Sequence, residues 1–432
     1  MQATIDQLVP GGQGIATLET GKKAFLWNAL PGETVEFEIT KQKSHYIEGT
    51  ATNIINPSPH RIKPKDPCYL STSPWQIMDY AYELEQKSLL VAECFRQQGI
   101  EISSDAGMTK SGDPRRAVLG GGRRGSTAGD LSTAGEEADR TQNTPSDEPD
   151  FGNITITNGQ DFFYRNKMEY SLYWDNNTNQ ISLAFHQRAT HKKIPITKSS
   201  LERPEIWREA TRWVAQLNAE GAEARDYQSL MLRCNQQGEV SGGFLLKNHP
   251  HPTFPPLSDT ILNKTYTYSV NGFFQINLPL YELALKSIRV ACQNAEEILD
   301  LYAGVGTIGL SVTDNQPLTL IESNPSAYKE LLANCSTKSA TPILAKSEQS
   351  LDYITNKTTI ILDPPRAGLD PQLTEKLLEQ APPTIIYLSC NPITQARDIK
   401  PLLTKYHLKS ITPFNFFPRT PHIENLAILS KI

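Results

Sequence analysis

The segment at residues 298–309 most constrains the fold of this chain. It reads Ile-Leu-Asp-Leu-Tyr-Ala-Gly-Val-Gly-Thr-Ile-Gly, an apolar run that leads directly into three glycines spaced as Gly-x-Gly-x-x-Gly. Glycines at this spacing let the backbone turn tightly from a strand into a helix and approach a bound nucleotide. Further apolar runs alternate with helix-like stretches, at 318–321, 343–344, 360–362, 385–386 and 427–429. This alternation predicts a mainly parallel, doubly wound sheet over residues 256–432.

The pattern before this sheet differs in two regions. Residues 1–58 hold short alternating runs separated by Pro-Gly turns, which is typical of a small β-barrel. Residues 151–255 alternate short apolar runs with charged turns, which suggests an antiparallel sheet. Before them, residues 103–149 consist mostly of Gly, Ser, Thr, Asp, Arg and Pro. We expect a disordered insertion there, because such a composition offers almost nothing to bury in a core.

The overall composition excludes several classes of protein. Of the 432 residues, 38% are hydrophobic and 21% charged, and no run approaches the ~20 apolar residues of a membrane span. The first residues lack a basic-then-apolar signal pattern, so we expect a cytoplasmic protein without a membrane partner. The six cysteines form no Cys-x-x-Cys pair, which argues against a disulfide framework and a zinc site. The net charge of -5 gives no global sign of nucleic-acid binding, so any RNA contact must be local.

Carboxylates at the ends of two apolar runs indicate what the glycine turn binds. Glu322 closes the next apolar run, where a carboxylate can accept hydrogen bonds from both ribose hydroxyls of a nucleotide. NAD and S-adenosylmethionine fit this arrangement equally well. The Asp-Pro-Pro-Arg sequence at 363–366 separates them, since it makes a rigid, donor-poor loop where a nucleobase could dock beside a methyl donor. This loop favours a nucleobase methyltransferase.

Two segments near the C-terminus supply candidate reactive groups. Cys390 follows the apolar run at 384–388, and Glu424 comes just before the run at 426–429. A thiolate that adds to C6 of a pyrimidine and a general base that removes the C5 proton are together what activation of C5 requires. Taken alone, Cys390 would more often be a packing residue, since free cysteine is among the most buried residue types. The motifs upstream favour the catalytic interpretation.

A stretch of the central domain combines rings with positive charge. Residues 162–170 interleave aromatic side chains with Arg165 and Lys167. Basic groups for phosphate beside rings for base stacking are one way to bind single-stranded RNA. The alternative is a strand with an ordinary solvated face.

Taken in order, these motifs resemble those of the RNA uracil-C5 methyltransferase family. The matching positions are 300–309, Glu322, 363–369, 389–392 and 417–424. Residues 271–277 look like the family's segment before the methyltransferase sheet, residues 164–167 like a basic strand of its central domain, and residues 1–58 like its TRAM barrel. The resemblance implies an α/β fold in three parts. A TRAM β-barrel (1–58) precedes a central RNA-binding α+β domain (59–255) and a Rossmann-like methyltransferase domain (256–432).

The resemblance also implies roles for individual residues. Cys390 would be the nucleophile that adds to uridine C6, and Glu424 the general base. S-adenosyl-L-methionine is the implied cofactor, with contacts from Gln275, Tyr302, Gly304, Gly306, Thr307, Glu322 and Asp363. RNA contacts are implied for Arg165, Lys167 and Arg366. The thiol needs a lowered pKa, which the N-terminus of the following helix or Arg366 could supply, although a salt bridge within the sheet is an equal reading of Arg366.

One departure from the family concerns metal. Many TRAM-bearing members carry a four-cysteine iron–sulfur site, but here only Cys68 matches its ligands, and Ser199 stands at the position of the fourth. One thiolate cannot hold such a cluster, so we expect no iron–sulfur cluster and no other metal.

Several interpretations of function stay open. The TRAM domain favours 23S ribosomal RNA as substrate, with transfer RNA as the alternative. Two further readings are an NAD-dependent oxidoreductase on the same sheet and a non-catalytic RNA-binding protein with this fold. We expect a monomer.

Overall fold

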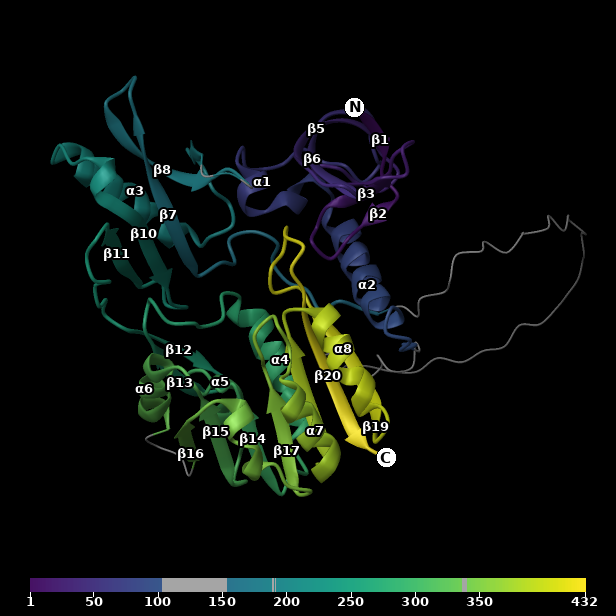
Figure 1. Cartoon of the computed structure of the whole chain (residues 1–432). Coiled ribbons are helices and arrows are strands. Elements are labelled where there is room, and N and C mark those ends of the chain that lie inside the picture. Colours follow the sequence, from purple (N-terminus) through teal and green to yellow (C-terminus); the bar gives the residue numbers. More distant parts are fainter. Residues whose placement is uncertain (103–153, 189, 191, 336–339) are drawn as a thin grey trace, which may run out of the picture.

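Four β-sheets follow one another along the chain in the computed structural model, which describes residues 1–102, 154–188, 190, 192–335 and 340–432. Figure 1 shows the N-terminal sheet and the central sheet side by side above the large C-terminal sheet. The insertion expected at 103–149 lies outside the described residues. Within the described ranges, no helix combines the length and the apolar character that crossing a membrane requires.

The N-terminal sheet is a curved, six-stranded sheet with the order β1-β5-β6-β4-β3-β2. Its strands are β1 (Gln2–Thr4), β2 (Gln7–Leu8), β3 (Gly14–Thr17), β4 (Lys23–Trp27), β5 (Thr34–Gln42) and β6 (Tyr46–Asn56). Alternate side chains such as Leu26, Val35 and Phe37 point into its core. This alternation is the period of a sheet with one face buried, and it agrees with the barrel predicted from the sequence.

The central sheet is antiparallel, as predicted, with the order β11-β10-β7-β8-β9. Its strands are β7 (Lys167–Asp175), β8 (Gln180–His186), β9 (Lys193–Pro195), β10 (Tyr227–Cys234) and β11 (Val240–Leu246). The apolar face of α3 (Pro204–Ala219) packs on this sheet, followed by η3 (Ala224–Asp226). The basic stretch at 162–170 is only partly a strand, because β7 begins at Lys167. A hairpin of β12 (Leu257–Ile261) and β13 (Lys264–Tyr268) leads to the C-terminal sheet.

The C-terminal sheet has seven strands in the order β16-β15-β14-β17-β18-β20-β19. They are β14 (Glu297–Leu301), β15 (Leu318–Glu322), β16 (Ala340–Leu344), β17 (Thr358–Leu362), β18 (Thr384–Ser389), β19 (Tyr406–Phe414) and β20 (Glu424–Lys431). Neighbours from β16 to β18 pair in parallel, and β20 runs antiparallel between β18 and β19. The predicted doubly wound α/β class is confirmed, with an antiparallel strand pair added at one edge.

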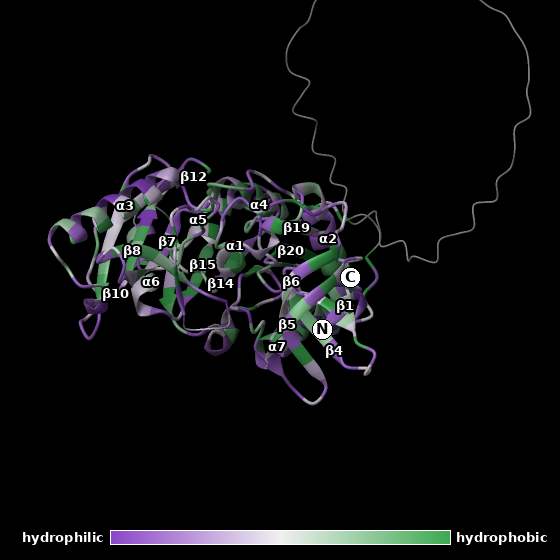
Figure 2. Ribbon diagram, turned by 90° about the horizontal axis from the view of Figure 1, so that it is seen from above, coloured by the Kyte–Doolittle hydropathy of each residue, from purple (hydrophilic) through white to green (hydrophobic). Residues whose placement is uncertain are grey.

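Helices cover both faces of this sheet, which explains why its central strands are mostly buried and mainly apolar. The helices are α4 (Leu278–Ala291), α5 (Thr307–Val312), α6 (Pro325–Asn334), α7 (Pro371–Gln380) and α8 (Pro392–Leu402), with short turns η4 (Ser347–Gln349) and η5 (Leu351–Tyr353). One core forms under α4 and α5, and the other under α7 and α8. Figure 2 shows hydrophobic residues mostly on the strands and hydrophilic residues mostly on loops and outer turns.

An N-terminal helix completes one face of the C-terminal sheet. After α1 (Tyr69–Thr72) and η1 (Pro74–Ile77), α2 (Tyr80–Arg96) is capped by Asp79, whose side chain accepts a hydrogen bond from the Tyr82 N–H. α2 lies against α8, and its side chains Leu90, Val91 and Phe95 join the core formed by α7 and α8. A helix from the stretch that the sequence assigned to the central domain therefore packs on the C-terminal sheet.

Candidate active site

A cavity of about 900 Å³ opens at the carboxyl ends of β14 and β15. Open α/β sheets bind ligands at this edge, where the loops after parallel strands meet. Six of the seven predicted cofactor residues line the cavity: Gln275, Tyr302, Gly304, Thr307, Glu322 and Asp363. The seventh, Gly306, has a φ of 90° and starts α5; a Cβ there would lie 2.6 Å from Leu331. Gly306 thus permits the close packing of the turn.

A hydrogen bond joins the glycine turn to Glu322 at the rim of the cavity. The Oε2 atom of Glu322 accepts a hydrogen bond from the Gly304 N–H at 2.8 Å, and Oε1 accepts one from the Asn324 N–H at 2.5 Å. Gly304 has a φ of 57°, and a Cβ placed on it would meet no atom within 4 Å. The turn therefore leaves open space above its backbone, where a ligand can approach closely.

Asp300 supports this turn from below, and the sequence analysis did not assign it a role. Its side chain is fully buried, and Oδ2 accepts a hydrogen bond from the Gly309 N–H at 2.8 Å. Burial raises the pKa of Asp300 to about 8. Among the described residues, no group hydrogen-bonds to its Oδ1 atom. A carboxylate inside an otherwise apolar run was the signal that could have identified it.

The loop at 269–277, which carries Gln275, is held by the central sheet. Arg233 on β10 donates to the carbonyl oxygens of Ser269, Gly272 and Phe274 at 3.3, 3.3 and 2.9 Å. Asn166 donates to the Gln275 carbonyl at 2.9 Å. The central domain therefore positions one wall of the cavity.

One of the predicted RNA contacts, Lys167, takes part in this interface, and a second, Arg165, lies beside it. The Lys167 ammonium lies 3.3 Å from the carbonyl oxygens of both Asn271 and Gly272, and burial lowers its pKa to about 8. Arg165 is half-buried and donates to the Lys167 carbonyl at 2.9 Å. Lys167 thus contacts the cavity loop of its own chain.

The structure brings Cys390 and Glu424 to adjacent strand ends. The antiparallel register of β18 and β20 pairs Ser389 with Asn425. The next residue of one strand and the preceding residue of the other, Cys390 and Glu424, therefore lie opposite each other. Glu424 is buried, whereas Cys390 is the one cysteine of the described residues that is not fully buried. Asn391 caps α8, and its side-chain amide donates to the Arg366 carbonyl at 3.0 Å.

The sequence predicted a lowered pKa for the Cys390 thiol, but in the structure this pKa is raised. Burial and the nearby Glu424 raise the pKa of the Cys390 thiol, and the charge and hydrogen bond of Arg366 offset only part of that rise. Burial, together with the neighbouring Asp363, raises the pKa of Glu424 well above its usual range. Burial also raises the pKa of Asp363 to about 7. Removal from water favours the neutral form of a thiol, and a nearby carboxylate acts in the same direction.

Arg366 is the positive group that faces these acids. It lowers the pKa of both Cys390 and Glu424, and its side chain is exposed. Its Nη2 atom lies 3.4 Å from Nδ1 of His422. The structure therefore places Arg366 beside the Cys390 thiol. This position agrees with the interpretation in which Arg366 supports the thiolate.

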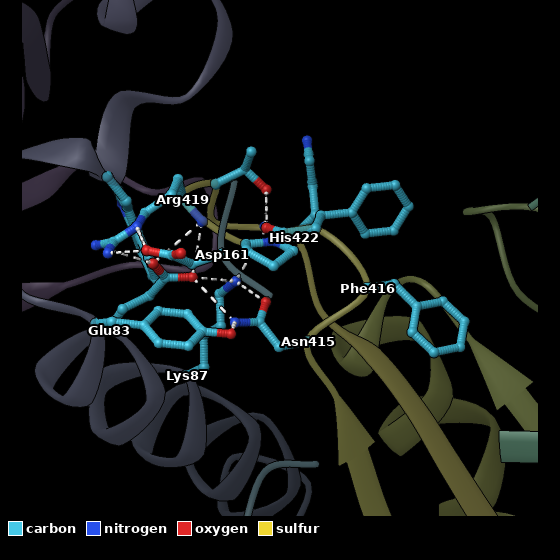
Figure 3. A network of polar contacts seen from close by, with 12 residues as sticks. Glu83, Lys87, Asp161, Asn415, Phe416, Arg419 and His422 are labelled. Atoms are coloured by element: carbon cyan, nitrogen blue, oxygen red, sulfur yellow. Dashed lines mark hydrogen bonds and ion pairs between the residues drawn. The ribbon is translucent and has the colours of Figure 1, made fainter. Parts of the chain in front are cut away.

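A buried polar network holds the segment that leads to Glu424 (Figure 3). Both carboxylate oxygens of Glu83 on α2 accept hydrogen bonds from the Arg419 N–H, at 3.0 and 3.1 Å. The Lys87 ammonium donates to Glu83 at 2.9 Å, to Asn415 at 2.6 Å and to the Phe417 carbonyl at 3.2 Å. The Arg419 guanidinium pairs with Asp161 and donates to the Met78 carbonyl.

The sequence analysis missed this network. Glu83 and Lys87 are fully buried, and burial lowers the pKa of Lys87. Their spacing of four residues would equally suit an ordinary surface pair on a helix. Nothing in the sequence of α2 shows that its charged partners lie at 415–419.

The region of Cys68 is held together by polar side chains. Asp66 accepts hydrogen bonds from the Ser200 hydroxyl at 2.7 Å and from Gln76, and the Ser199 hydroxyl donates to Glu202 at 2.5 Å. Burial raises the pKa of the Cys68 thiol to about 11. Across the described ranges, no cluster of three or more His, Cys, Asp or Glu side chains is arranged to hold a metal ion. The absence of an iron–sulfur cluster stays a prediction.

Comparisons with known proteins agree with these motifs. Residues 347–432 match the family model described as tRNA (Uracil-5-)-methyltransferase, and residues 1–52 match the TRAM domain. A protein of Lactiplantibacillus plantarum is 24% identical over 462 residues, which cover 100% of this chain and 97% of that protein. A protein of Bacillus cereus is 26% identical, over 99% of this chain and 96% of its own length. Both are described as uncharacterized RNA methyltransferases.

One solved structure shares the fold over nearly the whole chain. It is the Pyrococcus abyssi tRNA (uracil-54, C5)-methyltransferase in complex with S-adenosyl-L-homocysteine, with a TM-score of 0.70 and 20% sequence identity. The alignment covers 99% of this chain and 100% of that one. The family models, the relatives that match along their whole length and the ordered motifs at this site together show that the chain is similar to RNA uracil-C5 methyltransferases and carries a TRAM domain at its N-terminus.

Proposed function

We propose that this protein transfers a methyl group from S-adenosylmethionine to C5 of a uridine in RNA, through a covalent bond between Cys390 and C6. One observation carries the proposal. The register of β18 and β20 sets Cys390 opposite Glu424, with Arg366 beside both. Asp363 raises the pKa of Glu424 and also lines the cavity, so the candidate catalytic residues lie next to the cavity. This supports a position for the uracil ring between the Cys390 thiol and the cofactor.

The cavity fits the cofactor in its shape and its polar groups. Gly304 leaves open space over the turn, and the Glu322 carboxylate is fixed at the rim, where it can accept hydrogen bonds from ribose hydroxyls. Gln275, Tyr302, Thr307 and Asp363 complete the proposed contacts, with Gly306 shaping the turn. S-adenosylmethionine supplies an electrophilic methyl group when it is bound. The Pyrococcus abyssi enzyme, solved with S-adenosyl-L-homocysteine, supports this choice.

The proposed roles of the reactive residues follow from their surroundings. The Cys390 thiolate adds to C6 of uracil, and the electron pair of the C5–C6 double bond becomes available at C5. Arg366 offsets the negative charge of the thiolate. After C5 has gained the methyl group, the Glu424 carboxylate removes the C5 proton, and the double bond re-forms as the Cys390–C6 bond breaks. A carboxylate with a raised pKa is a stronger base, which suits this step.

The substrate within the RNA class is also part of the proposal. We propose 23S ribosomal RNA, because the chain carries a TRAM domain in addition to the catalytic fold. Transfer RNA is the second candidate, favoured by the family model and by the Pyrococcus abyssi enzyme, which acts on uracil 54 of transfer RNA.

Three parts of the chain have proposed tasks. Residues 1–58 and 59–255 contact the RNA, and residues 256–432 carry methyl transfer. Arg366 is exposed beside the thiol, which supports an RNA contact, and Arg165 is a further candidate. Lys167 is the weakest of the three, since its ammonium already bonds to loop carbonyls. A single chain holds the cavity and both reactive groups, which supports a monomer, and a cytoplasmic location is part of the same proposal.

The test combines product analysis with trapping of the adduct. The purified protein is incubated with labelled S-adenosylmethionine and with ribosomal or transfer RNA, and nucleosides are identified by mass spectrometry. We expect 5-methyluridine in one of the two RNAs. Cys390→Ala should form no covalent enzyme–RNA complex on a denaturing gel, whereas Glu424→Gln should accumulate one, since its methylated adduct cannot lose the C5 proton. Methylation at another atom, or an adduct in Cys390→Ala, would contradict the proposal.

A further inference from the structure

A turn of the N-terminal sheet touches the segment that leads to Glu424. Gly12 lies between β2 and β3 with a φ of 91°. A Cβ placed on Gly12 would lie 2.6 Å from both Cβ and Cγ of Pro421. Real Cβ atoms do not approach a proline ring this closely, so only glycine fits against Pro421 here. Pro421 stands three positions before Glu424 in the sequence.

Trp75 joins the same two segments through hydrogen bonds. Its indole N–H donates to the Gly12 carbonyl at 3.0 Å, and its backbone N–H donates to the Arg419 carbonyl at 3.1 Å. The side chain is 1% exposed, and the Lys87 ammonium lies 5.6 Å from its ring centroid. Since both donors are buried, breaking either hydrogen bond would leave a polar group without a partner.

The segment at 417–423 is thus fixed from two sides. On one side, Arg419 adopts a φ of 63°, and Glu83 accepts hydrogen bonds from its backbone N–H. A residue with a side chain keeps such a backbone conformation only where its surroundings determine it. On the other side, the Gly12 turn closes over Pro421. Within the segment, the Thr420 hydroxyl donates to the Phe417 carbonyl at 2.7 Å.

We propose that the Gly12 turn of the N-terminal barrel is a positioning element for Glu424, acting through Pro421. This inference rests on the proposed function, because it assumes that Glu424 removes the C5 proton. The barrel then has a task in the proton-removal step in addition to any contact with RNA. Gly12 touches neither substrate nor cofactor in this role, so it is a positioning residue.

The chain offers a matched pair of variants to test this. Gly12→Ala places a methyl carbon 2.6 Å from the ring of Pro421, which is too close. Gly21→Ala, in the same barrel, introduces one at a φ of 77° where no atom lies within 4 Å. Both variants carry the backbone strain of a positive φ, and only the first presses on the segment before Glu424.

We expect Gly12→Ala to slow turnover by about ten- to a hundredfold, since a displacement of about 1 Å at a catalytic group can cost this much. A covalent enzyme–RNA complex that already carries the methyl group should accumulate on a denaturing gel. KM for RNA and the affinity for S-adenosylhomocysteine should stay within about twofold of the wild type. Gly21→Ala should turn over without accumulating the complex. A merely structural weakening of the barrel would not stall the reaction after methyl transfer.

A second variant covers the case in which Gly12→Ala does not fold. Trp75→Phe keeps a buried aromatic ring but removes the indole N–H that bonds to Gly12, together with part of the ring volume, and it should accumulate the same complex to a smaller extent. Normal turnover of soluble Gly12→Ala, or of Trp75→Phe when Gly12→Ala is insoluble, would overturn the inference. So would equal losses in Gly12→Ala and Gly21→Ala, or a raised KM for RNA with an unchanged kcat. A wild-type protein that makes no 5-methyluridine would instead contradict the proposed function.

Discussion

Replacing Lys87 by methionine should loosen α2 and the segment before Glu424 together. The ammonium is fully buried and donates to Glu83, Asn415 and the Phe417 carbonyl. Removing one partner of a buried ion pair costs about 3–5 kcal/mol, because the other charge stays buried. Glu83 keeps the Arg419 N–H and the Asn415 amide as donors, so we expect about 3 kcal/mol.

Hydrogen exchange of the α2 amides measures this loss where it occurs. A loss of about 3 kcal/mol corresponds to roughly a hundredfold faster exchange, at about tenfold per 1.4 kcal/mol. The control is Arg96→Met on the same helix, where the arginine side chain is 59% exposed and pairs with Glu93. An exposed pair contributes about 0–1 kcal/mol, so exchange should change little.

Two outcomes would contradict this reasoning. The first is a Lys87→Met effect no larger than that of Arg96→Met. The second is additivity with Glu83→Gln, because side chains that bond directly in a buried network should show a coupling energy in a double-mutant cycle.

Three further predictions concern the cavity and the thiol. Glu322→Ala should weaken S-adenosylhomocysteine binding in calorimetry by roughly 1.5–3 kcal/mol, because it removes a charge-assisted hydrogen bond; Glu379→Ala, on the outer part of α7, should not. Arg366→Met should move the pH profile of Cys390 alkylation further towards high pH, since the thiolate loses its nearby positive charge; the exposed Arg397 provides the control. Arg233→Met should free the loop at 269–277 and weaken cofactor binding more than Arg208→Met on α3.

Each of these three predictions has a result that would contradict it. Unchanged affinity in Glu322→Ala would mean that the ribose lies elsewhere. An alkylation profile of Arg366→Met that stays in place, or moves towards low pH, would mean that Arg366 does not stabilise the thiolate. Equal affinities in the two arginine variants would mean that the loop holds its shape without the central sheet.

The sequence predicted the C-terminal sheet because its signals are local. β17 is buried along its whole length and carries the apolar run at 360–362, since both of its faces are covered, and the glycine turn follows β14 directly. Tyr302, Glu322 and Asp363 stand at the carboxyl ends of parallel strands, so their convergence on one cavity followed from the parallel arrangement. Gln275 lies instead on the loop that the central sheet holds.

The parts that the sequence did not predict depend on contacts between distant segments. Lys87 and Asn415 are 328 positions apart, and neither position differs in type from an ordinary surface residue. Lys167 carries the charge expected of an RNA contact, yet its ammonium lies against loop carbonyls that the central sheet brings near. The raised thiol pKa of Cys390 arises from burial, which a motif does not encode.

The packing of α2 on α8 has a consequence for modularity. Leu90, Val91 and Phe95 of α2 complete the core on one face of the methyltransferase sheet. A fragment that begins after the central domain would expose that apolar face to water and would lose the partners of Arg419. Cutting or recombining this chain between its sheets should therefore give an aggregation-prone fragment, even though Cys390, Glu424 and most of the cavity lie beyond the cut. We therefore expect activity to require the whole chain, because the C-terminal sheet alone lacks the packing of α2.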